Sequence, residues 1–73
     1  MQKQFEIVPR HGAWDVRHNQ VSFRLCEHKR DAIRLALSLG RLQGRLGDDA
    51  EVILLDGEGA PLARRRIPAR KPN

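Results

Sequence analysis

The chain has 73 residues, of which 40% are hydrophobic and 32% are charged, and its formal net charge is +5. That length leaves room for one domain with a modest core, and the balance of apolar and charged residues is that of a folded chain rather than a disordered one. The single cysteine, Cys26, excludes an internal disulfide, and the first residues lack the apolar run of a signal peptide, so we expect a protein of the reducing cytoplasm without a membrane span.

Three short stretches near the N-terminus alternate apolar and polar residues, with the period of two that is typical of strands. They are QFEIVP at 4–9, AWDVRH at 13–18 and VSFRLC at 21–26. Because they follow one another with short polar breaks, they predict a three-stranded antiparallel meander.

The register of this meander follows from placing like faces opposite one another. Turns at 10–12 and 19–20 put the large apolar side chains on one face, and the expected pairs are Phe5 with Val16, Ile7 with Trp14, Val16 with Phe23 and Trp14 with Leu25. On the other face Asp15 falls opposite Arg24, which predicts a cross-strand ion pair.

The segment 29–43 has helical spacing, and Gly44 or Gly47 is its expected C-terminal stop. At 100° per residue its apolar side chains cover an arc of roughly 220°, whereas packing on one sheet requires little more than about 100°. The remaining arc holds Arg30, Arg34, Ser38, Arg41 and, if the helix reaches it, Arg45.

The surplus apolar arc predicts a self-association surface. We expect Leu35, Leu39 or Leu42 to contribute to it, in a two-fold homodimer. The alternative is that a fifth strand and the 44–50 loop wrap the helix and bury these leucines within one chain.

The C-terminal part predicts two further strands. EVILLD at 51–56 is an unbroken apolar run, which is typical of a strand covered on both faces. DGEGAP at 56–61 is a turn signal, and LARRRI at 62–67 predicts a charged edge strand. We therefore expect one α+β domain over 1–67, a two-layer sandwich of approximately βββαββ order, followed by a flexible basic tail at 68–73. The position of the last strands in the sheet stays open.

Three stretches, FEIVP, GAWDV and HKRDAIRLA, resemble the family of small bacterial proteins called domain of unknown function 2188. The matching positions are Pro9, Trp14, Val16, Lys29, Asp31, Ala32, Ile33 and Ala36, with Gly57 or Gly59 as the late turn. The resemblance covers most of residues 5–67. It implies a small mixed domain of strands and a helix, and it implies no activity.

Residues with metal-binding or nucleophilic chemistry are few. His11, His18, Cys26 and His28 do not have the spacing of a known zinc site, and the expected register places Cys26 and His18 on opposite faces. Neither cysteine nor serine is accompanied by a base and an oxyanion site. We therefore expect a chain that is not an enzyme and that needs no metal, cofactor or small-molecule substrate.

The basic residues point to a polyanion. Residues 1–60 hold nine basic and nine acidic side chains, so the whole excess comes from Arg64, Arg65, Arg66, Arg70 and Lys71. A basic segment on a neutral body is typical of weak contact with the DNA or RNA backbone, independent of sequence. Arg30, Arg34 and Arg41 of the helix form an expected auxiliary patch. Two alternatives stay open: a solvated helix face, or a face that meets the acidic 48–58 segment of a neighbouring copy.

Overall fold

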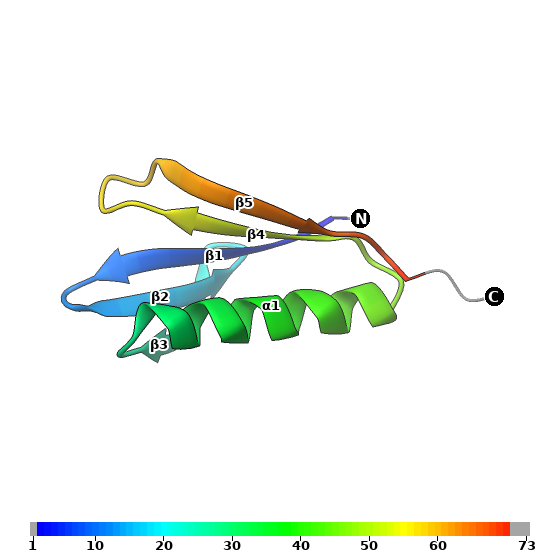
Figure 1. The fold of residues 1–73 in the computed structure, drawn as a ribbon, viewed down its shortest axis with the longest axis horizontal. Helices are drawn as coiled ribbons and strands as arrows, with labels where there is room; N and C mark the ends of the chain where they lie inside the picture. Colours follow the sequence, from blue (N-terminus) through cyan, green and yellow to red (C-terminus); the bar gives the residue numbers. More distant parts are fainter. Residues whose placement is uncertain (1, 71–73) are drawn as a thin grey trace.

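The structure, a computed structural model, describes residues 2–70. In chain order its elements are β1 (Lys3–Arg10), β2 (Ala13–His18), β3 (Val21–Cys26), α1 (Lys29–Arg45), β4 (Ala50–Leu55) and β5 (Pro61–Ile67). The strands form one mixed sheet in the order β3-β2-β1-β4-β5, and α1 lies along one face of it (Figure 1). This arrangement confirms the α+β class. It also places the last hairpin, because β4 runs parallel to β1 and β5 forms the second edge.

The meander turns through two two-residue loops. Residues 11–12 have φ values of 49° and 80°, and residues 19–20 have values of 52° and 67°. Two consecutive positive φ angles give the tight hairpin turn whose twist matches that of the flanking strands. The turn at 11–12 is shorter than the three-residue turn expected from the sequence.

The shorter turn changes the register between β1 and β2. Ile7 pairs with Val16 and Phe5 pairs with His18, so the expected pairs are wrong by two residues. A shift of two keeps every side chain on its face, since successive side chains of a strand alternate. Phe5, Ile7 and Val16 therefore still lie together in the core, as expected.

A bulge in β3 has a larger effect. Arg24 pairs with Val16, but Ser22 pairs with the next residue, Arg17, so Phe23 is an extra residue on the bulged strand. The expected pairing of Val16 with Phe23 is therefore wrong. From the bulge to the end of β3, each side chain lies on the opposite face of the sheet from the one expected. Arg24 therefore lies on the helix-facing side, opposite Val16, where Phe23 was expected.

Because of the bulge and this exchange of faces, Phe23 and Leu25 do not join the core. Leu25 pairs with Asp15 rather than with Trp14, on the face away from α1. Val21, Phe23 and Leu25 are all exposed. The edge strand β3 thus presents three large apolar groups to solvent.

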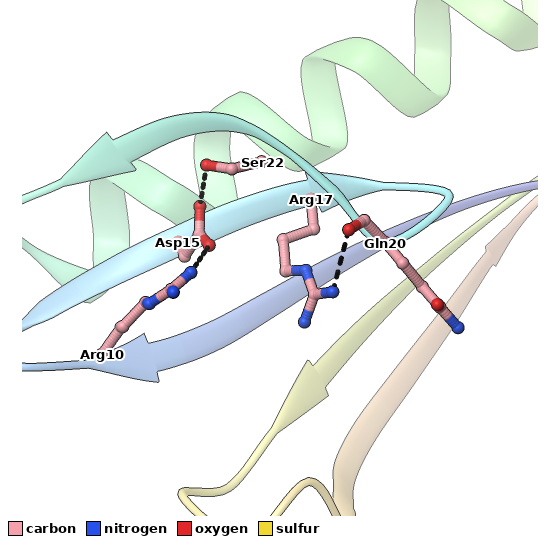
Figure 2. A network of polar contacts seen from close by, with 5 residues as sticks. All are labelled: Arg10, Asp15, Arg17, Gln20 and Ser22. Carbon is pink, nitrogen blue, oxygen red and sulfur yellow. Dashed lines mark hydrogen bonds and ion pairs between the residues drawn. The ribbon is translucent and has the colours of Figure 1, made fainter.

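Asp15 is a buried charge, with only 1% of its surface exposed. Its carboxylate accepts a hydrogen bond of 2.6 Å from the hydroxyl of Ser22 and one of 3.1 Å from Nη1 of Arg10. Figure 2 shows the two donors reaching Asp15 from β3 and from the end of β1. The expected ion pair with Arg24 is therefore wrong, and Arg10 supplies the positive charge instead. A buried carboxylate requires such partners, because its lost hydration must be replaced.

Small residues bring α1 close to the sheet. Its buried positions are Ala32, Ala36, Gly40 and Gly44, which recur every fourth residue along one stripe. A Cβ at position 40 would lie 2.6 Å from Cδ1 of Ile67 on β5. The helix ends at Arg45, two residues beyond the expected end, and Gly47, one of the two expected stops, lies just beyond it at a φ of 95°.

The Asp15 contacts give a first test. Ser22→Ala removes the hydroxyl donor and leaves a buried carboxylate with one partner, so we expect it to lower the free energy of unfolding by about 1–3 kcal/mol. Urea unfolding followed by circular dichroism measures this loss. Ser38→Ala, on the exposed face of α1, is the matched control and should change the free energy by less than about 0.5 kcal/mol. Equal effects of the two substitutions would contradict the role of Ser22.

Candidate functional site

The arginine triplet of β5 is divided between the two faces of the sheet. Arg64 lies 3.3 Å from Oε1 of Glu51, and Arg66 lies 3.6 Å from Oδ2 of Asp49. Arg65 alternates with them and faces the helix side, opposite Val52. All three arginines of this triplet were expected to contact nucleic acid, but two of them are already paired with acids of the chain itself.

The helix arginines have no such partners. Arg30, Arg34, Arg41 and Arg45 follow the exposed side of α1, and we call this row the arginine ridge. Among residues 2–70, none of the four lies within 4.0 Å of a carboxylate. The structure thus groups the three helix arginines named from the sequence and adds Arg45, because α1 continues to that residue.

The arginine ridge destabilises the isolated helix. Arg30 and Arg34, like Arg41 and Arg45, are like charges four residues apart, and each such pair destabilises a helix by a few tenths of a kcal/mol, roughly 0.2–0.5. The helix dipole favours a cation at Arg45, near the C-terminus, but it disfavours one at Arg30, in the first turn. Stability of the helix therefore does not explain the row.

The start of the C-terminal tail is held against the end of α1. The amide of Ala69 donates to Oδ1 of Asp49 at 2.7 Å, and the amide of Arg70 donates to the carbonyl of Gly44 at 2.8 Å. Gly44 permits this approach, since a Cβ there would lie 3.2 Å from the carbonyl oxygen of Pro68. The described part of the expected flexible tail, 68–70, is thus tied to the domain by two hydrogen bonds.

This contact closes a basic hollow. It has a volume of about 310 Å³, and its lining is Arg41, Gly44, Arg45, Ile67, Pro68 and Arg70. Three guanidinium-bearing side chains from two segments far apart in the sequence therefore share one concave site. We call it the arginine hollow. Because arginines of both α1 and the tail line it, the hollow is a candidate site for an anion.

The other residues singled out in the sequence lie apart from the hollow. Lys71 lies outside the described residues. Leu35 and Leu39 are half-buried and pack against the core, whereas Leu42 is exposed. The role of Gly44 was missed, because a glycine near a predicted helix end is read as a stop signal. Its spacing of four from Gly40 was the available clue to a close approach.

The histidines and Cys26 are spread over the fold. His11 lies in the first turn, His28 precedes α1, and Cys26 is half-buried at the end of β3. The ring of His18 stacks on Phe5 with a centroid distance of 4.8 Å. Within residues 2–70, no three His, Cys, Asp or Glu side chains come together as a metal site would require. In the same part of the chain, no helix has the length and apolar character needed to cross a membrane.

Asp49 gives a pH-dependent test of the tail contact. The hydrogen bond from Ala69 holds the pKa of the Asp49 carboxyl below its ordinary value of 3.8, and Arg66 lowers that pKa further. A lowered pKa in the folded chain means that the contact is fully stabilising above the ordinary value and is lost as the pH falls through the lowered one. We expect the amide signal of Ala69 to move with this titration in an NMR pH series.

Variants of the two neighbouring aspartates check the assignment. Asp49→Ala should abolish the titration and speed hydrogen exchange at Ala69 and Arg70. Asp48→Ala changes the same charge one residue away, where the carboxylate makes no ion pair within residues 2–70, and should leave both signals unchanged. Slow exchange at Ala69 in the Asp49→Ala protein would contradict the proposed anchoring.

The chain matches no family model, no curated protein and no solved structure. The resemblance to domain of unknown function 2188 therefore stays a prediction. The candidate functional surfaces of the chain are the arginine ridge, the arginine hollow and the exposed apolar groups.

Proposed function

We propose that the chain is a non-catalytic binding module of the cytoplasm that contacts the phosphate backbone of DNA or RNA without sequence preference. One observation carries this proposal. The ridge arginines and Arg70 have no acidic partner within 4.0 Å among residues 2–70, and they share one surface that ends in the hollow. Unpaired arginines gathered in this way favour a polyanionic ligand.

The spacing of the arginine ridge suits a phosphate backbone. Residues four apart on a helix are separated by about 6 Å along its axis, which is close to two of the about 3.4 Å steps by which the phosphates of one strand advance along the axis of a duplex. From Arg30 to Arg45 the ridge is about 22 Å long. Guanidinium groups bind phosphate with two parallel hydrogen bonds, so each arginine can serve one phosphate.

The hollow provides the most defined contact. Arg41 and Arg70 line it from different segments of the chain, together with Ile67 and Gly44. A phosphate in this position would neutralise both arginines at once. The proposal thus gives the helix and Arg70 the main role, with Arg65 and Lys71 as further positive charges of the chain. Arg64 and Arg66, which pair with acids, contribute less.

A second candidate function is a homo-oligomeric protein-interaction module without nucleic-acid binding. The exposed apolar groups of β3 and of the end of α1 favour it, because a small monomer rarely exposes so many. The two functions use different sides of α1 and are tested separately.

The nucleic-acid proposal is tested by two matched double variants. Arg41→Gln with Arg70→Gln removes two charges from the hollow, and Arg64→Gln with Arg66→Gln removes two charges from β5. We expect the hollow variant to bind a short DNA duplex more weakly, and the slope of log affinity against log salt to fall by about 1.8, since each phosphate contact contributes about 0.9. Fluorescence anisotropy at several salt concentrations measures both quantities.

The β5 variant is the control and should keep nearly the wild-type affinity and slope. Equal weakening of both variants would show that only net charge matters and would remove the hollow from the proposal. If the wild-type chain binds neither duplex DNA nor single-stranded RNA at low salt, the proposal fails. Circular dichroism establishes that each variant is folded.

Gly44→Ala tests geometry at constant charge. Its new Cβ would press on the Pro68 carbonyl and move Arg70 away from Arg41. We therefore expect weaker binding of the duplex, although no charge has changed and alanine favours the helix by about 1 kcal/mol relative to glycine. Unchanged affinity would mean that Arg70 contributes without being held at the hollow.

A further inference from the structure

Within residues 2–70, five of the six exposed large apolar side chains belong to β3 or to the end of α1. The six are Val21, Phe23, Leu25, Leu42, Leu46 and Leu62. The first three belong to β3. Leu42 and Leu46 lie at the end of α1, on the flank opposite to Ile33 and Leu37, which face the β4–β5 hairpin. Only Leu62 of this set lies at the β5 edge.

The end of α1 extends beyond the β2–β3 hairpin. The last pair of that hairpin, His18 with Val21, is level with Phe5, which in turn pairs with Val52. A Cβ at Gly40 would lie 3.6 Å from Val52, so Gly40 marks the same level on the helix. The residues after Gly40 therefore have the tail on one side and no strand on the other. Figure 1 shows α1 continuing past the turn between β2 and β3.

The uncovered flank has a regular spacing. Leu35, Leu39, Leu42 and Leu46 follow one another at intervals of four, three and four residues, the spacing of an interhelical seam. Exposure increases along it: Leu35 and Leu39 are half-buried, Leu42 is 44% exposed and Leu46 is 67% exposed. We call this row the leucine flank. The small residues of α1 are the ones that pack on the sheet. The exposed half of the leucine flank, Leu42 and Leu46, therefore has no packing partner within residues 2–70.

We propose that the occupant of the leucine flank is a second copy of this chain, related by a two-fold axis, with the two α1 helices antiparallel. In this arrangement Leu35 lies opposite Leu42 of the partner, and Leu39 lies near the axis. The projecting end of each helix then lies beside the β2–β3 hairpin of the other copy. Val21, which is 68% exposed and shares the helix-facing side of the sheet with His18 and Phe5, is level with Gly40 and so lies beside the middle of the partner's helix.

Charge complementarity selects this orientation. The pairing that sets Leu35 against Leu42 of the partner also brings Asp31, in the first turn, next to Arg45 of the partner, in the last turn. Asp31 and Arg45 are 14 residues apart, or about 21 Å along one helix, so they cannot pair within a chain. A parallel arrangement would place Asp31 level with Asp31 and Arg45 level with Arg45. Antiparallel packing therefore gives two ion pairs where parallel packing gives none.

The first experiment measures mass by light scattering over a range of protein concentration. We expect the wild-type chain to approach twice its 8.3 kDa as the concentration rises. Leu42→Glu with Leu46→Glu should raise the dissociation constant about a hundredfold or more, because two buried leucines are lost and two charges are introduced. Leu62→Glu, on an equally exposed leucine at the other edge (63%), is the control and should leave the dissociation constant unchanged.

The second experiment tests orientation by charge exchange. Asp31→Arg alone and Arg45→Asp alone should each weaken the homodimer, since each places like charges together at both ends. An equimolar mixture of the two variants restores both ion pairs, so we expect it to form heterodimers at least about tenfold more tightly than either variant forms homodimers. Native mass spectrometry distinguishes the two kinds of dimer.

Three results would overturn the proposal. The first is a wild-type mass that stays at 8.3 kDa at the highest concentration reached. The second is a dimer that survives both glutamates, which would place the interface elsewhere, for example along the exposed edge of β3. The third is a mixture of the charge variants that associates no better than its components, which would exclude the antiparallel arrangement. Circular dichroism confirms that the variants are folded, and the substituted leucines are exposed enough for this to be expected.

Discussion

The close approach of α1 to the C-terminal half of the sheet controls the rest of the molecule. Alanine and glycine at every fourth position let the helix backbone descend until Ile67 would touch a Cβ at Gly40. Because these small residues make the contact, the long side chains of α1 are displaced to its flanks. One turn later, at Gly44, the same stripe contacts the chain that follows β5, where the amide of Arg70 donates a hydrogen bond to the carbonyl of Gly44. The basic hollow and the leucine flank therefore both follow from one packing arrangement.

The periodicity of the sequence was sufficient to locate the elements, but not their alignment. The periods of strands and helices follow from the alternation of apolar and polar residues, and every position of the sequence contributes to that pattern. Register depends on single turns and bulges. Only Gly12 signalled the positive φ of the first turn; His11 adopts the same backbone without a glycine. The bulge at Phe23 exchanged the faces of β3, and nothing in VSFRLC distinguishes a bulged strand from a regular one.

The pairing of the charges could not be predicted from the sequence either. The sequence located the positive excess at the C-terminus, because net charge is a sum over residues and ignores pairing. In the fold, Glu51 and Asp49 of the acidic segment lie beside Arg64 and Arg66, since β4 and its leading loop are adjacent to β5. Two of the five acids that one alternative set against a neighbouring copy thus pair with arginines of their own chain. The helix row, whose members looked auxiliary in the sequence, is among the basic groups that have no carboxylate within 4.0 Å in residues 2–70.

The arginine ridge and the leucine flank are separate surfaces of one helix, about 120° apart at 100° per residue. Neither stabilises the isolated domain: one places like charges at helical spacing, and the other exposes leucines to water. An antiparallel pair of helices that meets along the leucine flank leaves both ridges facing away from the sheets, side by side and running in opposite directions. The two strands of a nucleic-acid duplex also run in opposite directions and are related by local two-fold axes. In the proposed dimer a symmetric pair of ridges would therefore match the symmetry of a duplex backbone, and self-association would present two rows of arginines to it.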